Sequence, residues 1–237
     1  MTYGKLFALK HGRSNIVVDL VNYFKLEDME IVFSDLKQPQ DYDADFVKYF
    51  PLKKFPAFII KNHSYNVHFK EDVFKMNEVV AILYCLLSRL VNNTESKRAI
   101  EAQKLLSGEI DDLQAYGSNC KWLCFTTNEF IPLMETIFKM KVTHEVQYDE
   151  VAYRELIKKA YFFMEDIIEP ELRNHCFLVT NNSPSISDLF IMTPILDFFS
   201  VEYDPAWCKK HPILMDWFNE TISHPMISYR LSNINMV

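Results

Sequence analysis

The order of strand and helix patterns in the first ninety residues limits the fold more than any other feature of this sequence. Apolar runs of strand length occupy 5–9, 29–33, 55–60 and 67–75. Apolar residues at helical spacing predict helices over 14–24, 41–49 and 77–90, with Ser14 and Asn77 as capping residues of the first and third. Because a helical crossover joins parallel strands and a direct connection joins antiparallel ones, we expect one sheet with a parallel half and an antiparallel half.

The strand patterns fade after a polar stretch, VNNTESK, at 91–97. Long helical periods follow it; Ile157, Ala160 and Met164, for example, share one face of an amphipathic helix. The sequence therefore predicts a thioredoxin-like α/β domain over 1–90, a linker over 91–97 and an all-α domain over 98–237.

Charge and glycine content exclude several classes of function. The formal net charge is −7 and the basic residues are scattered among acids, which argues against direct nucleic-acid binding. The sequence has four glycines, Gly4, Gly12, Gly108 and Gly117, and they cannot form a GxGxxG or a Walker loop. We therefore expect no nucleotide cofactor of these kinds.

The cysteines and the apolar runs indicate a cytoplasmic chain without metal. The five cysteines form no CxxC pair and no Cys/His ligand spacing, and an odd number is typical of reduced thiols in the cytosol. The N-terminus lacks the features of a secretory signal. The longest apolar run, 79–87, is roughly half the length of a membrane span, so no membrane association is expected.

Four sequence segments carry a resemblance to a known family. FPLKKFPAFII at 50–60 resembles the segment that leads into the cis-proline of glutathione transferases. NYFKL at 22–26, LLSGE at 105–109 and PAWCKKHPILMDWFN at 205–219 fit the same family in the same order. The chain is most similar to the transferase-like domain of the gamma subunit of eukaryotic translation elongation factor 1, in its fungal form. This resemblance implies the glutathione-transferase fold.

The string Ser185-Ile186-Ser187-Asp188 is similar to the capping box with which the family starts a buried helix of its second domain. In such a box the Ser185 hydroxyl accepts from the N–H of Asp188, and the Asp188 carboxylate reaches back to residue 185. The alternative is an ordinary helix start, because SxxD strings are common.

The resemblance also implies a set of glutathione contacts. Pro56 matches the cis-proline, which leaves the backbone of Phe55 free to pair with the cysteinyl part of glutathione; the alternative is an ordinary trans proline that opens a strand. Lys54 matches a residue near the glycyl carboxylate, with a solvated lysine as the alternative. Glu78 matches the acid of a Glu-Ser pair, but Val79 lacks the second hydroxyl. An acid in the first turn of a helix also suits the helix dipole, which is the alternative for Glu78.

The group that would activate the glutathione thiol is the weakest part of this match. Transferases use a Tyr near the end of the first strand or a Ser at the start of the first helix to favour the thiolate. Phe7 stands at the Tyr position, His11 lies near the usual Ser, and the hydroxyls of Ser14 and Tyr3 are displaced. His11 and Ser14 are the catalytic candidates, with a solvated histidine as the alternative for His11.

Three functions follow from the resemblance. The first is a protein similar to elongation factor 1-gamma that associates with other translation proteins, including elongation-factor subunits, and forms a homodimer. The second is a weakly active glutathione transferase that conjugates glutathione to hydrophobic electrophiles. The third is a more general protein-binding relative of transferase folds in synthetase complexes. Glutathione is the small ligand implied in the second case.

Overall fold

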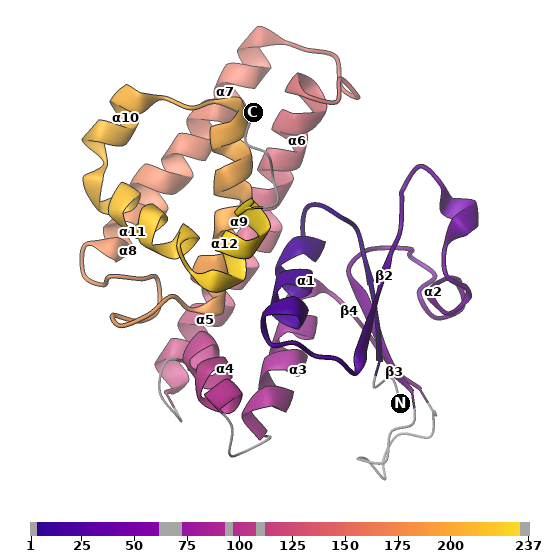
Figure 1. Ribbon diagram of the computed structural model, residues 1–237. Coiled ribbons are helices and arrows are strands. Elements are labelled where there is room, and N and C mark those ends of the chain that lie inside the picture. Colours follow the sequence, from indigo (N-terminus) through magenta and orange to yellow (C-terminus); the bar gives the residue numbers. More distant parts are fainter. Residues whose placement is uncertain (1–3, 62–72, 93–96, 108–111, 233–237) are drawn as a thin grey trace. The chain divides into compact units, whose positions relative to one another are not determined.

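The computed structural model describes residues 4–61, 73–92, 97–107 and 112–232, and the chain divides into two compact units, Met1–Asn92 and Asn93–Val237 (Figure 1). The division falls within the predicted linker at 91–97, of which residues 93–96 lie outside the described residues. Each unit is built around its own apolar core.

The described strands of the first unit form one four-stranded sheet in the order β2-β1-β3-β4. Their bounds are β1 Gly4–Ala8, β2 Met29–Phe33, β3 Ala57–Lys61 and β4 Val73–Asn77. β1 is parallel to β2 and antiparallel to β3, which is antiparallel to β4. This mixed sheet confirms the predicted thioredoxin-like order. The fourth strand ends two residues later than predicted, and residues 67–72 of the predicted strand lie outside the described residues.

Helices cover both faces of this sheet (Figure 1). α1 (Ser14–Tyr23) and α3 (Val79–Asn92) pack on one face, and α2 (Ala44–Tyr49) lies on the other, after a short 3-10 turn at Pro39–Asp41. α3 has no buried polar residue on its inner face, which consists of Val79, Ile82, Leu83, Leu86, Leu87 and Leu90. On the α2 side the core is a hydrophobic cluster made of Phe7, Phe46, Phe50, Ala57 and Ile59.

The start of α3 differs from the prediction. Asn77 is the last residue of β4, because it pairs with Ala57 of β3, and so it does not cap the helix. The carbonyl oxygen of Glu78 accepts the first helical hydrogen bond, from Ile82 N at 3.0 Å, and Glu78 has a φ of 73°. The prediction that Glu78 lies in the first turn of the helix is therefore wrong, since the helix begins at Val79.

The described part of the second unit is helical throughout. Two π-helical segments, Thr126–Phe130 and Phe163–Ile168, each join two α-helices end to end. The α-helices are α4 Lys97–Ser107, α5 Leu113–Phe125, α6 Ile131–Lys141, α7 Glu150–Phe162, α8 Glu169–Leu172, α9 Ile186–Val201, α10 Pro205–Lys210, α11 Pro212–Ile222 and α12 Pro225–Ser232. Within the described residues, no helix has both the length and the apolar character needed to cross a bilayer.

α9 is the central helix of this unit, and a buried carboxylate organises its start. Ser185 and Asp188 form the predicted capping box: Asp188 N donates to Ser185 Oγ, and Ser185 N donates to Asp188 Oδ2 at 2.9 Å. Asp188 Oδ1 also accepts from Leu178 N and from the indole Nε1 of Trp217, both at 2.8 Å. Burial raises the pKa of Asp188, and its hydrogen bonds with Ser185, Leu178 and Trp217 oppose that shift.

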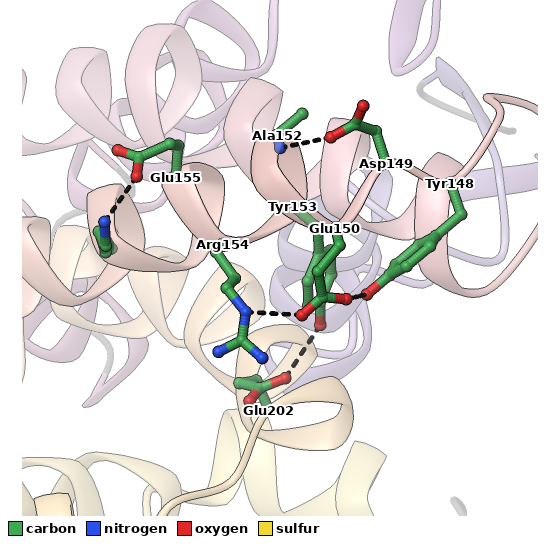
Figure 2. A network of polar contacts seen from close by, with 9 residues as sticks. Tyr148, Asp149, Glu150, Ala152, Tyr153, Arg154, Glu155 and Glu202 are labelled. Carbon is green, nitrogen blue, oxygen red and sulfur yellow. Dashed lines mark hydrogen bonds and ion pairs between the residues drawn. The ribbon is translucent and has the colours of Figure 1, made fainter.

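We predict that Asp188→Ala lowers the free energy of unfolding by about 3 kcal/mol or more, because two buried N–H groups and an indole lose their acceptor. Asp149→Ala is the matched control, because Asp149 also caps a helix, α7, by accepting from Ala152 N at 2.8 Å, but is exposed (Figure 2). Asp149→Ala should lower the free energy of unfolding by about 1 kcal/mol. Urea unfolding of both variants measures the difference, and equal losses would contradict this role of Asp188.

Candidate functional site

The register of the sheet brings three chain segments to one end of the first unit. Phe7 of β1 lies opposite Ala57 of β3, and Ala57 lies opposite Asn77 of β4. The turn after β1, the residues before β3 and the residue after β4 therefore emerge at the same end of the sheet. These three segments carry most of the ligand-binding and catalytic residues predicted from the sequence.

The turn after β1 contains both catalytic candidates, in different environments. His11 is exposed, and Gly12 follows it with a φ of 61°, a left-handed conformation that favours glycine. Ser14 is 1% exposed, and its Oγ accepts a hydrogen bond from Leu9 N at 3.0 Å. The prediction that Ser14 is the N-cap is wrong, because Arg13 holds that position and Ser14 is the first residue of α1.

The aromatic residue at the end of β1 belongs to the core. Phe7 is fully buried, and its ring lies 5.3 Å from that of Phe46 and 6.0 Å from that of Phe50, centroid to centroid. It offers no hydroxyl to a ligand thiol. Tyr3, the other nearby hydroxyl named from the sequence, lies outside the described residues.

The segment before β3 contains the predicted cis peptide bond, between Phe55 and Pro56. The ring of Phe55 stacks on that of Phe46 at 4.3 Å and 15°, and it meets Tyr42 edge-on at 5.6 Å. This side chain is therefore part of the packing around α2. What residue 55 offers to a ligand is its backbone.

After β4, Glu78 supplies the acid of the predicted Glu-Ser pair, but Val79 has no hydroxyl. Glu78 is exposed in its left-handed conformation at the end of the sheet. Val79 is 2% exposed and belongs to the inner face of α3. A glutamyl group bound here would find a carboxylate for its amine but no side-chain hydroxyl at residue 79.

A hollow of about 230 Å³ lies beside these segments, within the first unit. It is lined by Tyr49, Phe50, Pro51, Leu52, Lys54, Lys75 and Asn77. Lys54 is the residue that it shares with the predicted glutathione contacts. Sequence reasoning missed Lys75 and Asn77, although their spacing of two residues puts them on one face of a strand. The strand was predicted at 67–75, so Asn77 was assigned to the helix.

A second cluster of polar side chains lies at the start of α7 in the other unit (Figure 2). Glu150 accepts from the hydroxyl of Tyr148 and from Arg154 Nε at 2.6 Å, and the hydrogen bond from Tyr148 lowers the pKa of Glu150. Tyr153 donates to Glu202 Oε2 at 3.0 Å, which ties α7 to the end of α9. These groups hydrogen-bond to one another, with Tyr148, Glu150 and Arg154 exposed and Tyr153 buried, so the cluster has a structural role.

Two further kinds of site, metal centres and reactive thiols, require particular groups of side chains. Within them, no three His, Cys, Asp or Glu side chains come together as a metal site. Cys120 and Cys124 are exposed one helical turn apart on α5, but partial burial and the neighbouring thiol raise the pKa of Cys124. A raised pKa keeps a thiol protonated and unreactive at neutral pH.

Comparisons with known proteins agree with this geometry. A profile of the family described as "Glutathione S-transferase, N-terminal domain" matches residues 2–65. "Elongation factor 1-gamma 1" of Saccharomyces cerevisiae is 27% identical over 228 residues, which cover 96% of this chain and 48% of that protein. The chain thus spans about half the length of this curated relative.

Solved structures show the same fold. The GST-like domain of elongation factor 1-gamma from Saccharomyces cerevisiae superposes with a TM-score of 0.72 at 24% identity, covering 97% of this chain and 93% of that one. A glutathione transferase from Phanerochaete chrysosporium, in complex with oxidized glutathione, superposes with a TM-score of 0.75 at 16% identity, over 98% and 96% of the two chains. The chain has the glutathione-transferase fold, and its predicted resemblance to elongation factor 1-gamma is confirmed.

We predict that Ser14→Ala lowers the free energy of unfolding by about 1–2 kcal/mol, because the N–H of Leu9, which is partly buried, then loses the Ser14 hydroxyl as its acceptor. His11→Ala, in the same turn but exposed, should change it by less than about 0.5 kcal/mol. Urea unfolding of the two variants makes the comparison. If Ser14→Ala were as stable as the parent chain, the hydroxyl would not be the structural group inferred from the hydrogen bond.

Proposed function

We propose that this chain uses the glutathione-transferase fold mainly to associate with other proteins of translation elongation, as a relative of elongation factor 1-gamma. The observation that carries the proposal is the sequence similarity to elongation factor 1-gamma over 96% of the chain. A single fold hosts many functions, so the residues of the site also have to support this one.

The geometry at the end of the sheet supports association over catalysis. Lowering the pKa of a bound thiol needs a donor or a positive charge beside the sulfur. Phe7 has no hydroxyl, and Ser14 is 1% exposed with its oxygen engaged by Leu9 N. The site offers backbone groups that can bind a peptide, but few side chains that can activate the thiol of a bound ligand.

The proposed partners are a second copy of the chain and subunits of elongation factor 1, including the nucleotide-exchange subunit. The proposed location is the cytoplasm, where translation takes place. These partners are proposed from the similarity to the curated relatives, and the chain spans about half of the length of those relatives.

Glutathione conjugation to hydrophobic electrophiles is the second candidate. The family profile over residues 2–65 and the cis bond before Pro56 favour it. Glutathione would then contact Lys54, the backbone of Phe55, Pro56 and Glu78. Exposed His11 is better placed to assist a thiolate than buried Ser14.

Size-exclusion chromatography of the purified chain with recombinant elongation factor 1 subunits tests the proposal. We expect the chain to co-elute with the nucleotide-exchange subunit and, alone, to elute as a dimer. Separate elution of every subunit at micromolar concentrations, well above the Kd of a stable complex, would contradict the proposed association.

Turnover of chloronitrobenzene at millimolar glutathione tests the second candidate. We expect a rate indistinguishable from the uncatalysed reaction, since Phe7 has no hydroxyl and the hydroxyl of Ser14 is buried. A rate that exceeds the uncatalysed one and is lost in the His11→Ala variant would instead establish the chain as an enzyme.

A further inference from the structure

Two exposed cysteines of the second unit lie on one face of α5. Cys120 and Cys124 are four residues apart within the helix Leu113–Phe125, so their side chains project from the same face, one turn apart. Both residues are exposed, and the thiol of Cys120 forms a hydrogen bond with that of Cys124. The two sulfur atoms therefore approach each other on a surface that solvent reaches.

The spacing of this pair is too wide for a disulfide in a regular helix. Residues i and i+4 of a helix have Cβ atoms about 5–6 Å apart, whereas a disulfide needs Cβ atoms about 3.5–4.5 Å apart. Trp122 and Leu123, which lie between the two cysteines, are buried and anchor this turn of α5 in the core. A disulfide between Cys120 and Cys124 would have to distort that anchored turn.

A metal ion that bonds to two sulfur atoms can span the pair without such distortion. A metal–thiolate bond is roughly 2.3 Å long, as for zinc, so two sulfurs on opposite sides of one ion are up to about 4.6 Å apart. Zinc itself takes four ligands in structural sites. Within the part of the chain that the structure describes, no third His, Cys, Asp or Glu side chain joins the pair as a metal site. The pair therefore suits a soft cation that needs only two thiolates, such as Cu(I).

The protonation of the thiols is compatible with such an ion. Burial and the neighbouring Cys120 thiol raise the pKa of Cys124, which makes this thiol a poor nucleophile at neutral pH. A soft cation instead displaces the proton from each sulfur, so two S–H bonds break, two metal–sulfur bonds form and two protons are released. The oxidation state of the ion does not change. The resulting complex carries one negative charge, which water can solvate because both cysteines are exposed.

We propose that Cys120 and Cys124 form a two-sulfur site for one soft monovalent cation, Cu(I), on the exposed face of α5. The ion would transfer to the pair from a more weakly binding carrier, such as a small thiol or a chelator. This inference revises the expectation of a chain without metal, which was drawn from ligand spacing. It goes beyond the proposed function and does not depend on the partners proposed there.

Competition with the chelator bicinchoninate tests this site on the intact, reduced chain in the absence of oxygen. The probe is the coloured complex of Cu(I) with bicinchoninate, whose absorbance falls as the protein withdraws the ion. We expect the parent chain to withdraw one ion per chain. C120S and C124S should each weaken binding by roughly tenfold or more, because the second thiolate then no longer binds within the same molecule.

Two variants serve as controls for the number of thiols. C176S removes another exposed thiol, outside α5, and should bind the ion as tightly as the parent chain. K121C/C124S keeps two exposed thiols on α5 but puts them at adjacent positions, which do not face each other. This variant should bind as weakly as C124S. Circular dichroism checks that each variant retains its helix content.

Several results would overturn the proposal. A parent chain that withdraws no ion would remove the site, and binding that persists in both C120S and C124S would assign the ion to other thiols. Equal binding by K121C/C124S and the parent chain would mean that thiol number, and not spacing, determines affinity. A copper complex that elutes from a sizing column as a larger species than the copper-free chain would place the ion between copies of the chain.

Oxidation supplies an independent test of the geometry. Glutathione disulfide could oxidise the pair to an internal disulfide, with two glutathione molecules released and two hydrogens lost from the chain. We expect mass spectrometry to detect no such bond between Cys120 and Cys124, because their spacing in α5 is too wide. Ready formation of this disulfide would show that α5 adapts to it, and would make the pair a redox site instead of an ion site.

Discussion

The pairing of β3 with both β1 and β4 is the constraint on which the arrangement of the first unit depends. Ala57 lies between Phe7 and Asn77, so the segments beyond these three residues meet at one end of the sheet. A slip of one residue would turn every side chain of β3 to the opposite face and move Phe58 and Ile59, both fully buried, into the wrong cores. The ring of Phe55, just before β3, stacks on Phe46 of α2 and adds a contact that this slip would disturb.

The second unit depends on the buried carboxyl group of Asp188 in a comparable way. α9 is buried over most of its circumference, so no amphipathic stripe determines its orientation. Asp188 fixes the orientation of α9 instead, because its two oxygens accept hydrogen bonds from Leu178, Ser185 and Trp217 at the same time. A buried carboxylate without these partners would be strongly unfavourable, and this requirement selects one packing of the surrounding segments.

Features decided by local chain chemistry could be predicted from the sequence. The strand and helix order follows from local apolar patterns, whereas the cis bond before Pro56 and the Ser185–Asp188 box were predicted from the resemblance to glutathione transferases. Features decided by long-range contacts could not. Glu78 lies outside α3 because Asn77 is held by Ala57, twenty residues earlier. The hollow joins α2 to β4, and no local pattern brings Tyr49 to Lys75.

Lys54 connects the two candidate functions of the first unit. It lines the hollow, and the resemblance to glutathione transferases also places it near the glycyl carboxylate of glutathione. A partner carboxylate paired with this ammonium would leave the glycyl carboxylate without its cation, so the two uses of the surface are alternatives. If the chain associates with proteins as proposed and binds no glutathione, Lys54 is not held to a role in catalysis. It is then a cation that the carboxylate of a partner can approach, on a protein of net charge −7.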